Sequence, residues 1–199
     1  GVNFGPYRDI DQGVFNCLKN GDRFLIQQIW TAEGGINSGF ANNWKKAKAA
    51  GITSFDASAW ICNNCTGNNP VNICRSIKNA LPDGFDGRVW IDFHWFPSYW
   101  VGDADTRMGF VQAVAVECRV NGLKIGIYSS SSKWAQVFGS ADYDAGLLKH
   151  FPLWYAHYDA SPSLDDWSSV SFGGFTKPTI KQYIGDMTVC SLVSGLNAS

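Results

Sequence analysis

Residues 88–95 read Arg-Val-Trp-Ile-Asp-Phe-His-Trp, and this stretch decides the fold. The candidate strand within it is Arg88–Phe93, which is apolar apart from Arg88 and Asp92, and this is typical of a strand that is buried on both faces. Five other stretches share this character, and Gly1 opens directly into a further strand. The five are Phe24–Trp30, Ile52–Ala57, Lys124–Tyr128, Pro152–Tyr158 and Thr179–Ile184.

Segments with apolar residues at helical spacing lie between these strands. The expected helices are Phe40–Ala50, Val71–Ala80, Asp105–Val120 and Ser131–Phe138. Alternation of strands and helices predicts a parallel sheet, and the absence of a Gly-x-Gly-x-x-Gly turn disfavours a dinucleotide-binding sheet. Because helical periodicity fades after Ser140, we expect one domain over residues 1–199 with the α/β architecture of an incomplete TIM-like barrel.

Charge and composition exclude several classes of partner. The 199 residues carry a net charge of −1 without a basic stripe, so nucleic acid is not an expected partner. No apolar run approaches the ~20 residues of a membrane span, and no cofactor is expected. Aromatic residues make up 15% of the chain. They indicate either a Trp-rich core or a cleft whose flat apolar faces bind sugars.

The six cysteines suit an oxidising compartment and predict a secreted or vesicle-lumen protein. They are Cys17, Cys62, Cys65, Cys74, Cys118 and Cys190. No His lies near Cys62–Cys74, so a zinc site is not expected. The pairing stays open, except that we expect Cys17 and Cys190 to be partners. N-glycosylation sequons begin at Asn64 and Asn197, and Asn64 is the expected glycosylation site. Because no signal peptide is visible, we expect the numbering to start at a mature N-terminus.

Functional residues of a parallel barrel gather where the strands end. The side chains expected there are Trp30, Asp56, Trp60, Asp92, His94, Trp95, Tyr128, His157, Tyr158 and Gln182. Asp92 and His94 are two residues apart on one strand and therefore face the same side. Tyr99 and Trp100 follow closely. The residues alone leave two interpretations open, a functional pair or a buried Asp–His hydrogen bond among core aromatics.

The order of segments resembles the family 25 glycoside hydrolases, the Chalaropsis-type lysozymes, especially their cysteine-bearing invertebrate and protist type. The matching stretches are Gly1–Asn3, Ile52–Ala57, Arg88–His94, Lys124–Tyr128, Leu153–Asp159 and Lys177–Tyr183. The resemblance implies a groove for a peptidoglycan-type or chitin-like oligosaccharide of amino sugars. The residues expected to line it are Trp30, Trp60, Trp95, Tyr99, Trp100, Tyr128, His157, Tyr158 and Gln182.

The resemblance fails at the catalytic positions. Asn3 stands where the family has Asp, and His94 stands where the family's Asp-x-Glu ends in Glu. A further Asp near the C-terminus matches Gly195, or alternatively Ser194. Only Asp92 keeps its carboxyl group, so we expect a secreted glycan-binding protein with lost or strongly reduced muramidase activity. The alternatives are an active lysozyme that uses Asp92 with His94 or Asp56, and a structural or partner-binding protein on an inherited barrel.

Overall fold

The computed structural model describes residues 1–21 and 24–199, which form a closed barrel of eight strands in sequential order. The strands are β1 (Val2–Phe4), β2 (Phe24–Trp30), β3 (Ser54–Trp60), β4 (Arg88–Asp92), β5 (Lys124–Ser129), β6 (Leu153–Ala156), β7 (Ile180–Val189) and β8 (Leu192–Ala198). Neighbours from β1 to β7 are parallel, and β8 is antiparallel to both β7 and β1. The predicted barrel is confirmed.

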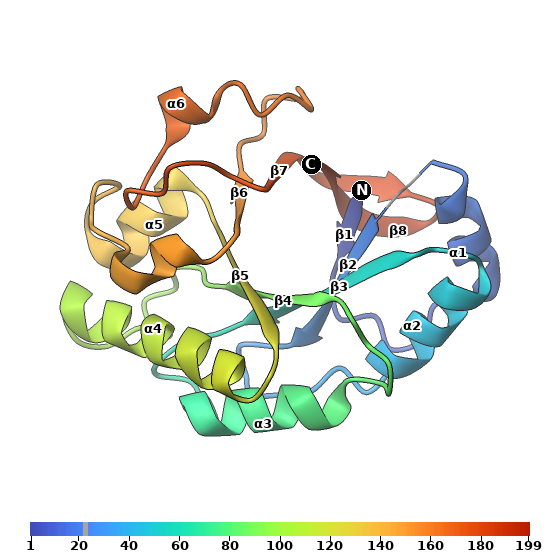
Figure 1. Cartoon of the computed structure of the whole chain (residues 1–199), viewed down its shortest axis with the longest axis horizontal. Helices are drawn as coiled ribbons and strands as arrows, with labels where there is room; N and C mark the ends of the chain where they lie inside the picture. The colour runs from blue at the N-terminus through green and yellow to red at the C-terminus, as the bar shows by residue number, and fades with distance from the viewer. Residues whose placement is uncertain (22–23) are drawn as a thin grey trace.

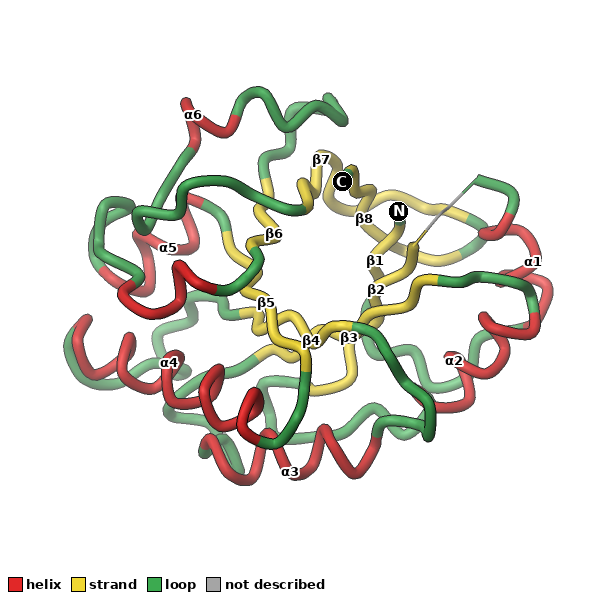
Figure 2. Tube along the Cα trace, in the orientation of Figure 1, coloured by secondary structure: helices red, strands yellow, loops and turns green. Residues whose placement is uncertain are grey.

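Helices surround only part of this barrel (Figure 1). They are α1 (Gln12–Lys19), α2 (Phe40–Ala49), α3 (Pro70–Ala80), α4 (Ala104–Val120), α5 (Ser131–Phe138), the 3₁₀ turn η1 (Gly146–His150) and the single turn α6 (Trp167–Val170). Long loops cover the side formed by β6 and β7 (Figure 2). The sequence therefore located the incomplete side correctly, although α1 and β8 were missed. Within the described residues, no helix has the length and apolar character needed to cross a membrane.

Local sequence signals explain where the helices begin and end. Asn69 caps α3 by accepting a hydrogen bond from the backbone N–H of Asn72, and Pro70 occupies the first turn. Ser130 caps α5 in the same way, by accepting a hydrogen bond from the backbone N–H of Lys133. Gly139 ends α5 with a φ of 88°, a conformation that glycine adopts without the strain other residues incur.

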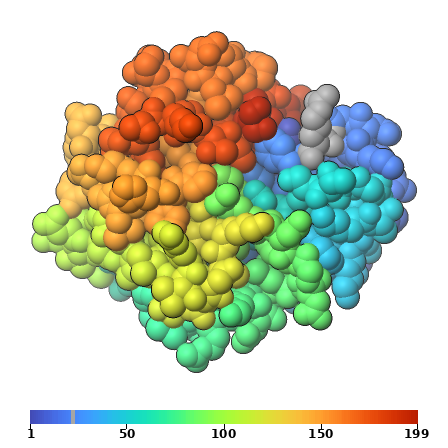
Figure 3. All heavy atoms as spheres, in the orientation of Figure 1, coloured from blue at the N-terminus to red at the C-terminus, as the bar shows by residue number. Residues whose placement is uncertain are grey.

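The core has two layers. The larger layer lies between the strands and the helices, and a smaller cluster fills the barrel interior with Ile26, Trp90, Tyr128, Trp154 and Ile180. The ring centroids of Tyr128 and Trp154 are 4.1 Å apart. The opening between the ribbons in Figure 1 is therefore filled by side chains, as the space-filling view shows (Figure 3).

Three disulfides link the elements. Cys17 on α1 pairs with Cys190 at the β7–β8 turn, as predicted for these two residues. Cys74 and Cys118 join α3 to α4, and Cys62 pairs with Cys65 in the loop after β3. Because all six sulfur atoms are in disulfides, none of them is a thiolate that could bind zinc.

Candidate functional site

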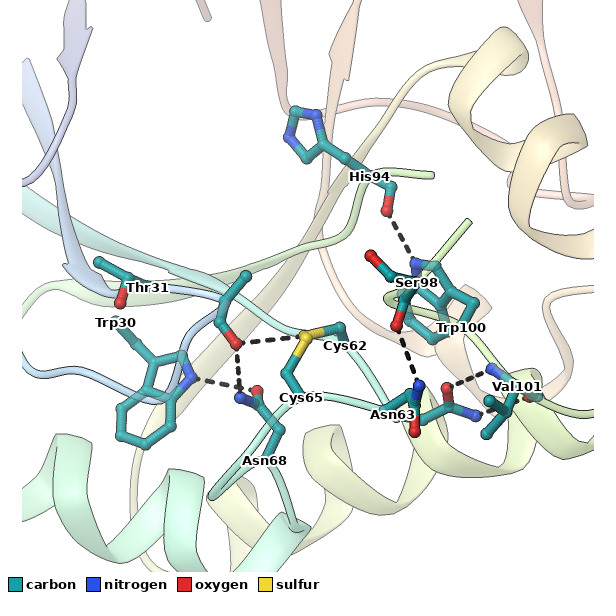
Figure 4. The surroundings of a disulfide bond; sticks show 12 residues. Trp30, Thr31, Cys62, Asn63, Cys65, Asn68, His94, Ser98, Trp100 and Val101 are labelled. Atoms are coloured by element: carbon teal, nitrogen blue, oxygen red, sulfur yellow. Dashed lines mark hydrogen bonds between the residues drawn. A yellow bond between two sulfur atoms is a disulfide. The ribbon is translucent and has the colours of Figure 1, made fainter. Parts of the chain in front are cut away.

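Asp92 and His94 lie together where β4 ends. Nε2 of His94 is 3.0 Å from Oδ2 of Asp92 in hydrogen-bond geometry. Oδ1 is 2.8 Å from the same nitrogen but outside that geometry, so it is a buried oxygen without a hydrogen-bond partner among the described residues. The carbonyl oxygen of His94 accepts a hydrogen bond from Nε1 of Trp100 at 2.7 Å, on the side away from the imidazole (Figure 4).

The pair lines a cavity of about 210 Å³ at this end of the barrel. Seven strands, β1 to β7, contribute to its wall, because parallel strands have their C-terminal ends at one rim. The lining side chains beside Asp92 and His94 are Asn3, Phe4, Gln28, Ser58, Tyr128, Lys133, Trp154, Tyr158, Gln182 and Asp186. Residues as distant in sequence as Asn3 and Gln182 thus form one site.

Neutral amides and phenols form a hydrogen-bond network beside Asp92. Oδ1 of Asn3 accepts from Nε2 of Gln182 at 3.0 Å and from Nδ2 of Asn197 at 2.9 Å. Oε1 of Gln182 accepts from the hydroxyl groups of Tyr128 and Tyr158 at 2.5 and 3.2 Å. Burial raises the pKa of Tyr128 well above its usual value, so this phenol remains a donor. The network needs no charged carboxylate.

Gly195 lies opposite Asn3 in the β1–β8 pairing. A Cβ atom at residue 195 would lie 3.0 Å or less from Nε2 of Gln182, Oδ1 of Asn3 and the carbonyl oxygen of Ile184. The space that a side chain would need is therefore filled by the Gln182 amide. A carboxylate at this position would require the whole amide network to rearrange.

Lys133 is one of the members of the site that the sequence did not predict. Its Nζ atom lies 3.2 Å from Nε2 of His94 and 3.2 Å from the hydroxyl oxygen of Tyr128. It also lies 4.4 Å from the centroid of the Tyr128 ring, and burial lowers its pKa. The signal that could have identified Lys133 is its position in the chain. The first turn of a helix that follows a barrel strand lies at the same rim as the end of that strand.

The family is shown by sequence similarity. A sequence model of the family described as "Lysozyme-like protein 1" matches residues 6–183. "Probable GH family 25 lysozyme 5" of Dictyostelium discoideum is 33% identical over 92% of this chain and 85% of its own length. The chain belongs to the lysozyme-like proteins of glycoside hydrolase family 25. "Counting factor 45-1" of the same organism is 37% identical, and this chain spans 61% of its length.

Solved lysozyme and autolysin structures share the fold at low sequence identity. The bacterial lysozyme from Streptomyces coelicolor superimposes with a TM-score of 0.75 at 16% identity, over 99% of this chain and 89% of that one. The modular autolysin LytC from Streptococcus pneumoniae, solved with a synthetic peptidoglycan ligand, gives 0.67 at 14% identity, over 98% of this chain and 46% of that one. These likenesses establish the architecture of this lysozyme-like protein.

Aromatic rings flank the cavity of the lysozyme-like protein on one side. The Trp60 ring centroid is 5.0 Å from that of His94 and 5.8 Å from those of Phe96 and Tyr99. We call Trp60, Phe96 and Tyr99 the aromatic shelf. Tyr158, which is 58% exposed, lines the cavity from the loop after β6.

Other predicted aromatic contacts are corrected. Trp30 is buried, and its Nε1 donates a hydrogen bond to Oδ1 of Asn68. Trp100 is buried as well, and its Nε1 donates to the carbonyl oxygen of His94. A glycan therefore cannot reach the face of either ring. The Trp95 ring lies 4.9 Å from the guanidinium carbon of Arg107 and does not line the cavity.

Asp56 is not part of this site, which corrects its expected place at a strand end. β3 continues to Trp60, so Asp56 lies near its beginning, at the opposite end of the barrel. Its Oδ1 accepts from the backbone N–H of Arg88 and its Oδ2 from Nε1 of Trp90, both at 2.8 Å. Burial raises the pKa of Asp56, and these hydrogen bonds only partly offset that effect. It lines a separate cavity of about 380 Å³.

His157 also lies outside the cavity, contrary to the sequence prediction. Its Nδ1 is 2.6 Å from Oδ2 of Asp166 and 3.5 Å from Oδ2 of Asp159. These three residues have ligand atoms close enough to hold a metal ion. However, Nζ of the fully buried Lys181 is 2.7 Å from Asp159 and 3.0 Å from Asp166. The lysine ammonium already supplies the positive charge that these carboxylates need.

Proposed function

We propose that this family 25 protein binds glycans of amino sugars without cleaving them. At the positions that are catalytic in the family, Asp92 in the cavity wall is the one carboxylate, because Asn3, His94 and Gly195 have none. This observation carries the proposal. Cleavage of a glycosidic bond requires a protonated group on the leaving oxygen, usually a carboxylic acid. Loss of general-acid help alone costs roughly 10²–10⁴ in rate.

His94 is poorly placed to replace that acid. Its Nε2 faces both the Asp92 carboxylate and the Lys133 ammonium, at 3.0 and 3.2 Å. A protonated imidazole would add positive charge beside an oxocarbenium-like transition state, and Lys133 already adds more. Lys133 and a protonated His94 would therefore both oppose the positive charge that develops during cleavage.

Binding needs none of the missing groups. The aromatic shelf and Tyr158 offer flat faces for the apolar side of sugar rings, and the cavity between them presents amide, hydroxyl and carboxylate groups for sugar hydroxyls. The LytC autolysin, which shares this fold, was solved in complex with a synthetic peptidoglycan ligand, and this supports a glycan as the ligand class.

Titration of the purified protein with a chitin tetrasaccharide and a peptidoglycan fragment tests the proposal. We expect heat of binding in calorimetry and no new reducing ends over the same period. Tyr158→Ala should weaken binding by about tenfold because it removes an exposed contact face. Met187→Ala is the matched control, since Met187 is 45% exposed on β7 and does not line the cavity. Turnover of peptidoglycan would support the active lysozyme instead.

We further propose that the protein is secreted and glycosylated at Asn64. Three disulfides favour an oxidising compartment. Asn64 is exposed in the loop closed by Cys62 and Cys65. Asn197, in contrast, is buried, and its amide is hydrogen-bonded to Asn3 and Trp154. Treatment with a glycosidase that removes N-glycans should therefore reduce the mass of the secreted protein by one glycan, and Asn64→Gln should abolish that change.

Two relatives are named counting factors rather than lysozymes, which favours a second candidate function without hydrolysis, a structural or partner-binding protein on an inherited barrel. This chain spans about three fifths of their length, 60% for "Counting factor 50" and 61% for "Counting factor 45-1". This candidate predicts that neither saccharide produces heat in the titration.

A further inference from the structure

Two largely buried lysines at the same end of the barrel differ in their counter-charges. Lys181 is completely buried, and its Nζ lies within 3.0 Å of two carboxylates. Among the described residues, the side chain of Lys133 contacts those of His94 and Tyr128, neither of which carries a carboxylate. In the part of the chain that the structure describes, no carboxylate oxygen lies within the 4.0 Å of an ion pair with Nζ of Lys133.

An ammonium group removed from water without a counter-charge carries an uncompensated desolvation cost. The lowered pKa of Lys133, caused by burial and only partly offset by Asp92, reflects that cost. Lys181 shows how the fold compensates a buried ammonium when its role is structural. Among the described residues, no carboxylate forms an ion pair with Lys133, and its side chain lines an open cavity instead.

Lys133 also has donor capacity left. An ammonium has three N–H donors, and the hydroxyl of Tyr128 accepts one of them at 3.2 Å. Nε2 of His94, also 3.2 Å away, accepts a second only in the tautomer in which it carries no proton for Asp92, so at least one donor is available to a ligand. A charged acceptor would gain about twice as much from it as a neutral hydroxyl, because charge-assisted hydrogen bonds are roughly twice as strong.

We propose that Lys133 makes the cavity selective for saccharides that carry a carboxylate. The inference rests on the proposed glycan-binding function and specifies the ligand class for the same cavity. Two acidic residues line the cavity as well. Asp92 is hydrogen-bonded to His94, and Asp186 is exposed at the rim, where solvent screens its charge. Lys133 is therefore the charged group of the wall that is available to an anionic substituent.

A pair of ligands that differ only in charge tests the proposal. The probes are a disaccharide of N-acetylglucosamine and N-acetylmuramic acid, and the methyl ester of its carboxylate. We expect the ester to bind about tenfold more weakly, the usual effect of losing one hydrogen bond between charged groups. A hyaluronan tetrasaccharide compared with a chitin tetrasaccharide shows whether a uronic carboxylate serves as well as a lactyl carboxylate.

Lys133→Gln should remove the preference by weakening the acid about tenfold and leaving the ester unchanged. Lys149→Gln is the matched control, because Lys149 forms a surface ion pair with Asp144 far from the cavity lining. Equal affinity of the wild-type protein for acid and ester would overturn the inference while leaving glycan binding intact, and that comparison stands even if the variant fails to fold. No binding of any saccharide would remove the proposed function and this inference together.

Discussion

The two ends of the barrel each hold a carboxylate beside a cavity, yet the two carboxylates are used differently. At the N-terminal end, both oxygens of Asp56 accept hydrogen bonds from β4. At the C-terminal end, Asp92 has one hydrogen-bonded oxygen and one without a partner. The cavity beside Asp56 is the larger, about 380 Å³ against 210 Å³. Cavity size therefore does not locate the candidate site, which instead holds the buried carboxylate oxygen that has no hydrogen-bond partner among the described residues.

The cause of the difference is the direction of the strands. Asp56 lies early in β3, where its neighbours are regular strands, and it joins β3 to β4. Asp92 lies where β4 gives way to a loop, so residues from several strands and from α5 can converge on it. The N-terminal carboxylate joins two strands of the barrel, and the C-terminal one lines the cavity of the candidate site.

Asp56→Ala should produce the largest effect and separate the two ends. Removing the carboxylate leaves the backbone N–H of Arg88 and Nε1 of Trp90 without acceptors, which we expect to lower the free energy of unfolding by about 2–3 kcal/mol. Denaturant unfolding measures this, and saccharide affinity should stay unchanged. Asp86→Ala, at an exposed residue lining the same cavity, should change stability by less than about 0.5 kcal/mol. Lost binding with unaltered stability would assign Asp56 to the ligand site after all.

The position of Asp56 also shows how far sequence reasoning reached. The apolar stretches predicted the order of β2 to β7 and the barrel, because buried parallel strands are continuous in apolar character. The end of β3 was placed three residues early, because Ser58 and Ala59 are small and give no clear strand signal. That error moved Asp56 to the wrong end. β8 was missed because Ser194 and Gly195 interrupt its apolar pattern.

The site itself was only half predictable. The Asp92–His94 pair followed from strand periodicity, since the two residues share a face. Lys133 did not, because its role depends on where a long flexible side chain on α5 ends relative to β4. The filling of the space beside Gly195 by Gln182 likewise depends on packing between β1, β7 and β8 that no local pattern encodes.

Acid titration should give a smaller effect at the cluster near β7. Burial alone would raise the pKa of Asp166, but hydrogen bonds from Tyr155, His157 and Lys181 outweigh it and lower the pKa to about 2. Asp159 is the other carboxylate facing this cluster. A folded-state pKa below the unfolded value stabilises the protein above about pH 4, and this stabilisation is lost as the pH falls towards 2. The loss should be at most about 2 kcal/mol, because a fifth of the Asp166 side chain is exposed to screening solvent.

Unfolding measured from pH 5 to pH 2 in wild type and Asp166→Asn tests this, and the variant should show the shallower fall. Asp56→Asn should have the opposite effect and show a steeper fall in the free energy of unfolding over this pH range than the wild type. The pKa of Asp56 is raised in the folded protein, so its ionisation works against folding as the pH rises through the unfolded value. Identical profiles for both variants would contradict the assignment of opposite roles to these two carboxylates.

His94→Glu should have the smallest effect, with no muramidase activity gained. The new carboxyl group would lie beside Nζ of Lys133, now 3.2 Å from Nε2 of His94, and an ammonium at that distance keeps a carboxylate ionised rather than able to donate a proton. Asn3 would still be neutral, and Gln182 would still fill the space beside Gly195. The release of reducing ends from peptidoglycan should stay at background. A triple variant removes the ammonium group as well and restores the carboxylate at residue 3, and it combines His94→Glu with Asn3→Asp and Lys133→Gln. Turnover by His94→Glu alone would mean that the rest of the C-terminal end is already competent for catalysis, and that a single residue separates a glycan-binding barrel from a lysozyme.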